Sequence, residues 1–283
     1  MELEKKQWTT VIEPKTRLLE LKLKEVWKYR DLIVLFVQRN IKVRFKQTIL
    51  GPLWFIIQPI FTTIIQTFVF GHIAKLPTDG LPQFLFYMAG NVPWAYFAAC
   101  LEGTSNTFTS NAGVFGKVYF PRLTTPISVA VTAIVNYLVQ FLMFLGFVLF
   151  FMIRGADVHI TWVAALTPML ILQMALLGMG CGIIISSLTT KYRDLQVLVG
   201  FGVSLWMYAT PIIYAGSTLS PTLYKILMLN PMAPVIELLR YGWLGAGTTP
   251  FGYWGISWVT TGILLFFGII LFNKVEKTFM DTV

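Results

Sequence analysis

Charged side chains are scarce in this sequence. Asp, Glu, Lys and Arg make up 12% of the 283 residues, whereas hydrophobic residues make up 56% and the mean hydropathy is +0.69. Because a soluble domain of average composition carries about 25% charged residues, this composition excludes an ordinary soluble protein. Apolar segments of about 20 residues cross a bilayer as helices. The sequence therefore predicts an all-α integral membrane protein.

Six apolar runs are long enough to cross a bilayer, and none of them contains Asp, Glu, Lys or Arg. They are residues 53–73, 84–101, 127–153, 160–188, 195–214 and 253–272. An ion-coupled carrier normally keeps an ionisable residue inside the membrane to bind or relay its ion. We therefore expect six transmembrane helices, in which any transport is driven from outside the membrane.

Cysteine and histidine are also rare, with two residues of each. Cys100 and Cys181 fall inside apolar runs, where packing is expected rather than a disulfide. The two histidines have no companions that could complete a metal site, so we expect no bound metal.

A P-loop is missing as well, because Gly116-Lys117 lacks both the glycine spacing before it and the Ser or Thr after it. We expect this chain to bind no cofactor and not to hydrolyse ATP itself.

Lys and Arg are distributed unevenly across the predicted spans. Of the 22 Lys and Arg residues, four fall on one side of the membrane: Lys75, Arg154, Lys225 and Arg240. By the positive-inside rule, the leader and the tail, which lie on the opposite side, are both cytosolic. We divide the chain into a cytosolic leader with an interface helix (1–47), a six-span membrane domain (48–273) and a cytosolic tail (274–283).

An amphipathic helical pattern precedes the first span. Apolar residues recur at every fourth position, namely Tyr29, Ile33, Val37, Ile41 and Phe45. Basic residues fall within an arc of roughly 60° at 100° per residue, namely Lys28, Arg39, Lys42 and Lys46. Leu35 interrupts this arc and Arg44 lies outside it. Two interpretations remain open: an anchor on anionic lipid, and a site that attracts the anionic head of a lipid-linked substrate.

Leu50, Gly51 and Pro52 join this helix to the first apolar run. Gly and Pro together are typical of a turn. We expect the turn to form part of the place where a substrate enters the membrane domain.

The segment 220–244 is long and apolar enough to be taken for a seventh span. Three prolines interrupt it, and it contains Lys225, Glu237 and Arg240. We expect a re-entrant or interfacial helix pair before the last span, packed against protein so that the interrupted backbone is satisfied. Glu237 and Arg240, three residues apart on one helix, are expected to pair.

Aromatic residues occur near the middle of two runs, at Trp94, Tyr96, Trp206 and Tyr208. Helix packing and the lining of a translocation path are both open interpretations, since a sugar polymer can slide over flat rings that also offer a hydrogen bond. We place Trp54 in the same candidate path. Small residues at Gly178, Gly180, Gly182 and Ser186 indicate close helix packing.

The loop after the second run, 111–122, is unusually apolar for a cytosolic segment. It contains Val114, Phe115, Tyr119 and Phe120, with Lys117 and Arg122 beside them and Pro121 before the third run. We expect these aromatics to be exposed and to dock a partner protein. The alternative is that they lie at the level of the lipid headgroups. The loop with Tyr192, Arg193 and Asp194 is a candidate second contact.

Four phrases carry a family resemblance, and they extend from about Leu32 to the end of the chain. They are TILGPLW (48–54) with Pro59, GNVPW (90–94) with Phe97, NAGVFGKVYFP (111–121), and LNPM (229–232) with Glu237 and Arg240. Together they make the chain similar to the membrane-spanning permease of type 2 ABC transporters that export bacterial surface polysaccharides such as O-antigen, capsule or teichoic acid.

This resemblance implies half of a transporter. Two copies would form a channel, and two copies of a separate cytosolic ABC ATPase, which bind the ATP and magnesium, would dock beneath it. The cargo would be a polysaccharide on a polyprenyl-pyrophosphate or similar lipid, and the location the bacterial cytoplasmic (inner) membrane. The resemblance places the ATPase contact at Asn111, Phe115, Lys117, Tyr119, Phe120 and Pro121, and the outer helix pair around Asn230 and Pro231.

No nucleic acid is expected among the partners. Two rival functions remain open, namely a drug or small-lipid exporter of the wider ABC group and a membrane scaffold without transport activity. A soluble-polymer cargo would favour the mid-span aromatics, whereas a drug would favour a closed apolar pocket.

Overall fold

The computed structural model describes residues 23–115, 117–118, 120–190 and 194–282. Within these residues the chain is helical, with turns and loops between the helices and no β-strand. The predicted all-α fold is confirmed. In chain order the helices are α1 (Leu23–Lys28), α2 (Arg30–Phe45), the 3-10 turn η1 (Gly51–Leu53), α3 (Trp54–Gln66), the π-helical η2 (Thr67–Ile73), α4 (Gln83–Ser105), α5 (Thr107–Phe115), α6 (Thr124–Ile153), η3 (Trp162–Leu166), α7 (Thr167–Thr189), α8 (Leu195–Tyr208), η4 (Gly216–Thr218), α9 (Pro221–Met228), α10 (Ala233–Leu244) and α11 (Phe251–Thr282).

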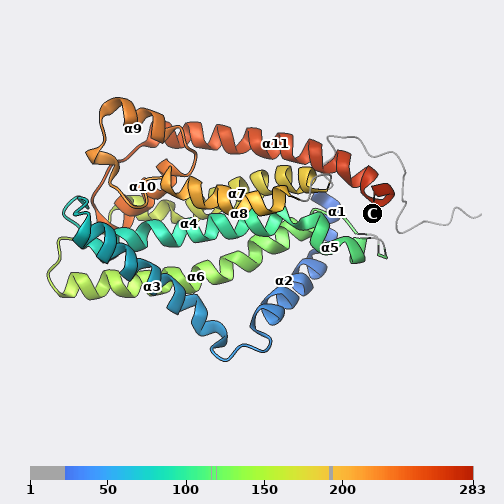
Figure 1. Cartoon of the computed structure of the whole chain (residues 1–283), viewed down its shortest axis with the longest axis horizontal. Coiled ribbons are helices and arrows are strands. Elements are labelled where there is room, and N and C mark those ends of the chain that lie inside the picture. Colours follow the sequence, from blue (N-terminus) through green and yellow to red (C-terminus); the bar gives the residue numbers. More distant parts are fainter. Residues whose placement is uncertain (1–22, 116, 119, 191–193, 283) are drawn as a thin grey trace, which may run out of the picture.

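Five helical stretches of the described chain are long and apolar enough to cross a membrane. They are Gly51–Ile73, Gln83–Ser105, Thr124–Ile153, Trp162–Thr189 and Phe251–Val275. These stretches correspond to five of the six predicted runs. They lie side by side in one bundle, with α1, α5 and the C-terminal end of α11 at one end (Figure 1).

The remaining run, 195–214, is helical over only part of its length. Helix α8 has 14 residues, which corresponds to about 21 Å, and a hydrocarbon core is about 30 Å thick. The helix ends at Tyr208 because Pro211 disfavours helical backbone just before it. Thr210 to Ile213 are buried in the protein, where irregular backbone is tolerated at membrane depth. The expectation of one continuous helix through Tyr214 is therefore wrong at its outer end.

The expected helix pair before the last span is present as α9 and α10, whose axes are bent by 104°. The pair lies at the end of the bundle opposite α1 and α5 (Figure 1). Gly245 ends α10 with φ +77°, a conformation that glycine adopts without a steric penalty.

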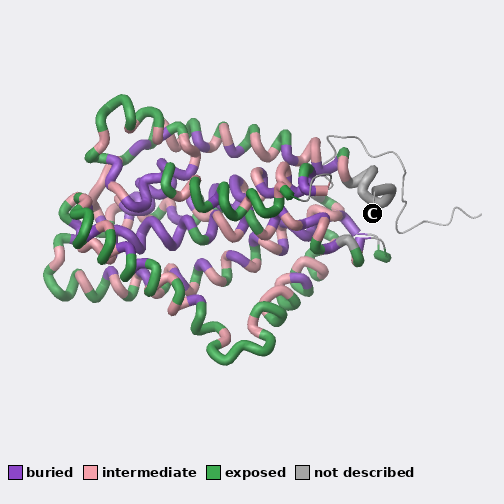
Figure 2. Tube along the Cα trace, in the orientation of Figure 1, coloured by how far each residue is buried: buried purple, intermediate pink, exposed green. Residues whose placement is uncertain are grey.

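Helix α4 forms the centre of the bundle. It packs against α3, α6, α7 and α10, and most of its trace is buried (Figure 2). Small residues on α7 allow a close approach, as the sequence indicated. A Cβ atom added to Gly182 would lie 2.6 Å from Thr104 Cβ and 2.7 Å from the backbone oxygen of Leu101. Neither distance is possible without movement of the helices.

We expect Gly182→Val to lower the free energy of unfolding by about 1–3 kcal/mol, because the added groups must separate α7 from α4. The thermal unfolding midpoint of the purified protein in detergent measures the effect. Gly262→Val, on α11, is the matched control, because a Cβ atom there would have no neighbour within 4 Å. Equal midpoints for the two variants would contradict close α4–α7 packing.

Candidate functional site

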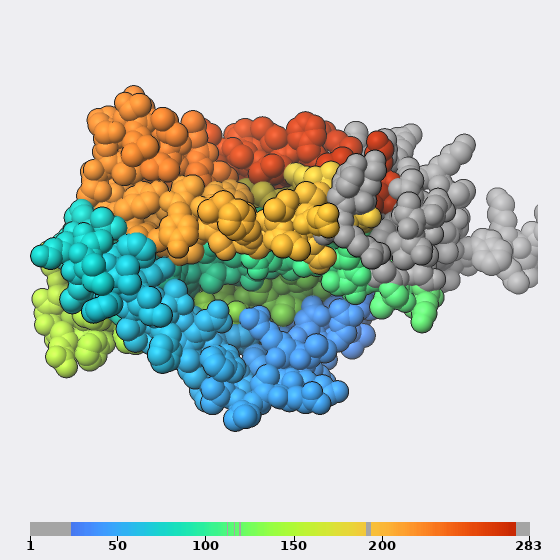
Figure 3. All heavy atoms as spheres, viewed as in Figure 1, coloured from blue at the N-terminus to red at the C-terminus, as the bar shows by residue number. Residues whose placement is uncertain are grey.

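Two cavities with polar lining residues lie beside α2, near the point where it turns into α3. Helix α2 packs along α6, and its predicted apolar stripe from Tyr29 to Phe45 is half-buried, with Phe36 fully buried. Apolar side chains of α2 are also exposed, at Val34, Leu35 and Val43, so its amphipathic character is weaker than the pattern predicted. The corner of α2 and α3, in blue, stands out from the bundle (Figure 3).

The turn at this corner has the expected glycine and proline geometry. Gly51 has φ +47°, and Pro52 lies in the first turn of η1. The hydroxyl of Thr48 donates to the backbone oxygen of Phe45 at 2.9 Å, which caps the end of α2. Ile49, Leu50 and Leu53 are exposed, so the turn presents an apolar tip beside the basic residues of α2.

A cleft of about 450 Å³ separates α2 from α5 and α6. Its lining residues are polar for the most part and include no carboxylate; they are Arg39, Asn40, Val43, Arg44, Gly103, Asn106, Ser110, Asn111, Thr125 and Val129. Helix α2 supplies both arginines, while the end of α4 and α5 supply amide and hydroxyl groups. This arrangement can hold an anion, because it offers many hydrogen-bond donors at one place.

A smaller cavity of about 190 Å³ shares one lining residue, Arg44, with the cleft. It is lined by Arg44, Phe45, Thr48, Gly51, Trp54, Phe55, Gln58, Asn136 and Gln140. Gln58, Asn136 and Gln140 are uncharged polar residues of the spans, and Gln140 donates to the Asn136 side-chain oxygen at 3.5 Å. Arg44 therefore lies at the junction of the two spaces.

The predicted basic arc contributes only one residue to the lining of this site. Lys28, Arg39, Lys42 and Lys46 are all exposed, but of these only Arg39 lines the cleft. Arg44, which the periodicity placed outside the arc, lines both cavities. Helical spacing could not identify it, because the second wall of the cavity comes from α3 and α6 beyond the turn.

The end of the bundle opposite α1 and α5 contains a buried ion pair that the sequence predicted correctly. Arg240 Nη1 donates to Glu237 Oε1 at 2.9 Å, and both side chains are inaccessible to solvent. Arg240 Nη2 also donates to the backbone oxygens of Pro211 at 2.9 Å and Ile212 at 3.3 Å. The guanidinium thus satisfies carbonyl groups left without helical partners where α8 ends.

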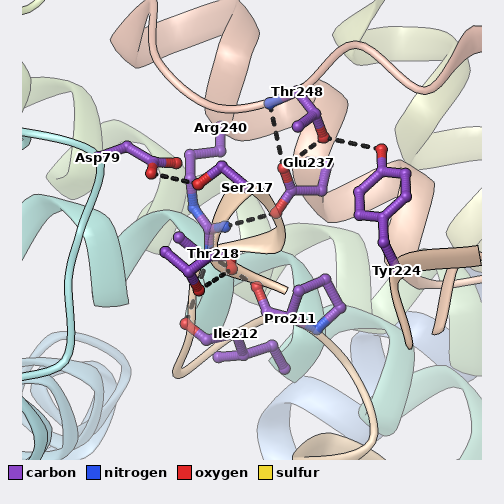
Figure 4. A network of polar contacts seen from close by, with 10 residues as sticks. Asp79, Pro211, Ile212, Ser217, Thr218, Tyr224, Glu237, Arg240 and Thr248 are labelled. Carbon is purple, nitrogen blue, oxygen red and sulfur yellow. Dashed lines mark hydrogen bonds and ion pairs between the residues drawn. The ribbon is translucent and has the colours of Figure 1, made fainter. Parts of the chain in front are cut away.

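Glu237 connects this pair to the surrounding loops (Figure 4). The backbone N–H and the hydroxyl of Thr248 donate to its second oxygen at 3.3 and 2.9 Å, and the Tyr224 hydroxyl donates to that of Thr248 at 3.1 Å. Ser217 donates to Asp79 from the loop before α4. The network joins the end of α8 to the loop after α10.

The mid-span aromatic residues separate into two groups. Trp94 and Tyr96 have exposed fractions of only 6% and 3% and lie in the core, where Tyr96 packs on Tyr137. Their rings are enclosed by neighbouring helices of the same chain, which favours the packing interpretation for these two residues. Tyr208, 60% exposed, and Trp54, 50% exposed, remain candidates.

Trp206 has a structural partner. Its indole nitrogen donates to the Asn230 side-chain oxygen at 2.9 Å, and its ring packs edge-on against Trp94 and Phe97. The Asn230 amide nitrogen in turn donates to the Ala209 carbonyl oxygen at 3.0 Å and the Thr210 hydroxyl at 2.8 Å. The half-buried Trp206 therefore joins α8 to the helix pair.

Pro231 extends this polar contact to the last span. Its carbonyl oxygen accepts from the Ser257 hydroxyl at 2.6 Å, and Ser257 accepts from the Gln173 amide at the same distance. In the described part of the chain, no group of three potential metal-ligating side chains is found.

Comparison with known proteins identifies the family. Residues 31–244 match the family described as "ABC-2 type transporter". The chain belongs to this family. It is 30% identical over 255 residues to an O-antigen export system permease protein RfbA of Klebsiella pneumoniae, which covers 89% of this chain and 94% of that one. It is 29% identical to an RfbA of Myxococcus xanthus (76% and 80% covered) and 23% identical to a polysialic acid transport protein KpsM of Escherichia coli (86% and 93% covered).

Membership of the ABC-2 type transporter family makes this chain a multi-pass membrane subunit of a transporter and not a catalytic chain. Members of the family typically bind no cofactor themselves, and an ABC ATPase is the implied partner. The loop between α5 and α6 is then the segment to consider for contact with that partner.

The aromatic residues of this loop do not face solvent. Phe115 and Phe120 have exposed fractions of 7% and 5% and form a buried cluster with Phe36, Phe108, Ile183 and Phe272. The expectation that they form an exposed docking surface is wrong, because α2, α7 and α11 all supply apolar side chains that enclose them.

The exposed part of the loop is small and basic. Lys117 and Val118 are exposed, whereas Asn111 and Pro121 are buried and the Asn111 amide donates to the Thr107 carbonyl oxygen at 2.9 Å. Asp194 is exposed immediately before α8. The predicted contacts at Tyr119, Tyr192 and Arg193 lie outside the described residues.

Proposed function

We propose that this chain is the permease half of an ATP-driven exporter that moves a lipid-linked polysaccharide, of the O-antigen, capsule or teichoic-acid type, across the bacterial cytoplasmic membrane. The observation that carries the proposal is the similarity to O-antigen export permeases along almost the whole length of both chains. The similarity to a polysialic acid transport protein supports the same class of cargo.

The proposed assembly contains two copies of this chain and two copies of a cytosolic ABC ATPase that binds ATP and magnesium. Both termini are cytosolic, in agreement with the distribution of Lys and Arg. The six apolar runs contain no Asp, Glu, Lys or Arg, which suits a conduit that is powered by its partner, since an ion-coupled carrier normally keeps an ionisable residue inside the membrane.

Substrate access is assigned to the corner of α2 and α3. The exposed Lys28, Lys42 and Lys46 attract anionic lipid heads to the membrane surface, at about 1 kcal/mol per cation. The apolar tip at Leu50, together with Gly51 and Pro52, lies at the level where the lipid part of a substrate would leave the bilayer. Trp54 and Tyr208 then offer exposed rings over which a sugar chain can slide.

A second candidate function, export of a small lipid or drug, has one observation in its favour. An apolar groove of about 450 Å³ runs between α7, α8 and α11, with Leu101, Cys181, Val203, Trp206 and Leu264 among its lining residues. The groove is open along one side and does not form a closed pocket. It therefore fits the acyl chain of a bilayer lipid at least as well as a transported molecule.

Deletion of the gene in its host is expected to lower surface polysaccharide at least about tenfold and to leave lipid-linked polymer inside the cell. Immunoblotting of surface polymer and extraction of the lipid-linked intermediate measure the two effects. The wild-type gene should restore export, whereas co-expression with an ATPase partner that cannot hydrolyse ATP should not. Unchanged surface polymer, with altered drug or lipid efflux, would support the second candidate.

A further inference from the structure

We propose that Arg39 and Arg44 form a diphosphate-binding site in the cleft beneath α2, and that the smaller cavity beyond Arg44 holds the first sugar attached to that diphosphate. The inference rests on the proposed function, since it names the part of a lipid-linked polysaccharide that this site recognises.

The first support is the chemistry of the cleft. Arg39 and Arg44 lie on one wall, and Asn106, Ser110 and Thr125 lie on the others, with no carboxylate among the lining residues. A guanidinium offers a planar fork of N–H donors that matches a phosphate with two parallel hydrogen bonds, whereas a lysine offers a point charge. Amide and hydroxyl donors nearby can bind the remaining phosphate oxygens.

The second support is that both guanidinium groups are positioned by rings. Arg39 lies over Phe36 with 4.7 Å between the guanidinium carbon and the ring centroid, and Arg44 lies over Phe55 at 5.0 Å. Neither arginine forms an ion pair with a carboxylate in the described part of the chain. A ring contact orients the plane of the guanidinium and leaves its edge available for a ligand. The Arg39 side chain also donates to its neighbour Asn40 at 3.1 Å, which orients it further.

The third support is the order of the two spaces. Arg44 lines both, so a group bound to it has the cleft on one side and the smaller cavity on the other. The smaller cavity offers an exposed indole at Trp54 and amides at Gln58 and Asn136. Aromatic rings and amides are suited to a sugar, because a sugar has both apolar faces and hydroxyl groups. The two spaces meet at Arg44, so a diphosphate bound there would have room for the attached sugar in the smaller cavity.

Binding of farnesyl diphosphate to the full-length permease with its ATPase, in phosphatidylcholine nanodiscs, tests the site. We expect Arg39→Gln and Arg44→Gln each to weaken binding at least about tenfold, and Arg44→Lys to weaken it less, because the charge remains but the fork is lost. Lys24→Gln with Arg30→Gln is the matched charge control, because both residues are exposed, on α1 and at the start of α2, and line neither cavity. A loss in the control equal to that in the arginine variants would overturn the site.

A second pair of variants distinguishes loss of binding at the site from loss of folding. Ser110 is exposed on α5 and lines the cleft, so Ser110→Asp adds a negative charge to the site with little effect on packing. It should reduce binding at least about tenfold. Gly113→Asp adds the same charge on the same helix, outside the cleft and with no neighbour within 4 Å of its Cβ atom, and should retain binding. Equal affinities for the two variants would contradict the proposal.

Competition distinguishes the sources of the phosphate. Inorganic pyrophosphate is expected to displace farnesyl diphosphate from the wild type, whereas phosphatidylglycerol added to the nanodiscs should displace it far less. Displacement by phosphatidylglycerol alone would overturn the diphosphate assignment.

An export assay in cells distinguishes failure of this site from failure of the proposed function. Normal export by the Arg39→Gln/Arg44→Gln variant would overturn this site only, whereas failure of the wild-type chain to support export would overturn the proposed function.

Discussion

Replacement of Arg240 by methionine is expected to lower the free energy of unfolding by about 3–5 kcal/mol, the largest single effect at the outer end of the bundle. The change leaves the Glu237 carboxylate buried without its counter-charge. It also removes the donors to the backbone oxygens of Pro211 and Ile212. The thermal midpoint of the purified chain in detergent and its recovery from membranes measure the loss.

Two further variants make this prediction specific. Glu237→Gln combined with Arg240→Met should be more stable than Arg240→Met alone, because no unpaired charge remains buried. Lys225→Met, on the exposed side of α9, is the matched control and should be close to the wild type. A midpoint for Arg240→Met equal to that of Lys225→Met would show that the buried pair does not stabilise the helix pair.

Truncation of the aromatic cluster at the end of the bundle with α1 and α5 is expected to have the second large effect. Phe115→Ala and Phe120→Ala should each cost about 3–5 kcal/mol, because each ring is buried and packs on other aromatics of the cluster. The ring centroids of Phe36 and Phe120 are 5.6 Å apart, and those of Phe115 and Phe120 are also 5.6 Å apart. Thermal unfolding of the permease without its ATPase measures this loss.

Substitutions at the exposed tip of the same loop should affect association with the ATPase and not the stability of the fold. Lys117→Glu with Val118→Asp is expected to leave the unfolding midpoint unchanged and to weaken association with the ATPase at least tenfold, which corresponds to about 1.4 kcal/mol. A pull-down and ATPase-coupled export measure association. If Phe115→Ala released the ATPase at unchanged stability, the rings themselves would be the docking surface and the buried cluster would be excluded as their main role.

The number and position of the long helices could be predicted from the sequence. The free-energy cost of placing a charged side chain in the bilayer depends on that residue itself and not on distant parts of the chain. Five charge-free runs became long helices, and the charged, proline-interrupted segment 220–244 became the bent pair α9 and α10. The pairing of Glu237 with Arg240 also followed, since residues three apart share one face of a helix. The length of α8 did not follow, because apolar composition alone does not reveal where the helix stops.

The candidate site was predicted less completely. Arg39 and the Gly51-Pro52 turn were identified, but Arg44 was missed. Phe115 and Phe120 were expected to be exposed and are buried, whereas for Trp94 and Tyr96 the sequence left packing and path lining both open. An aromatic residue in a loop or in mid-span has the same sequence signal whether it faces a partner, a path or another helix. Its environment depends on segments that are distant along the chain, such as Ile183 and Phe272 for the cytosolic cluster.

By itself, the sequence determined which segments of this protein are apolar enough to enter the membrane, where the chain turns between α2 and α3, and that its apolar runs carry no Asp, Glu, Lys or Arg. These properties depend on the transfer cost of single side chains and on the backbone preferences of glycine and proline, which act over a few residues. Only the tertiary structure decided that Arg44 lies between two cavities and that the loop aromatics are buried. Both outcomes depend on the packing of helices that are far apart in the chain. Helical periodicity shows which residues share one face of a helix, but it does not show which other helix that face contacts.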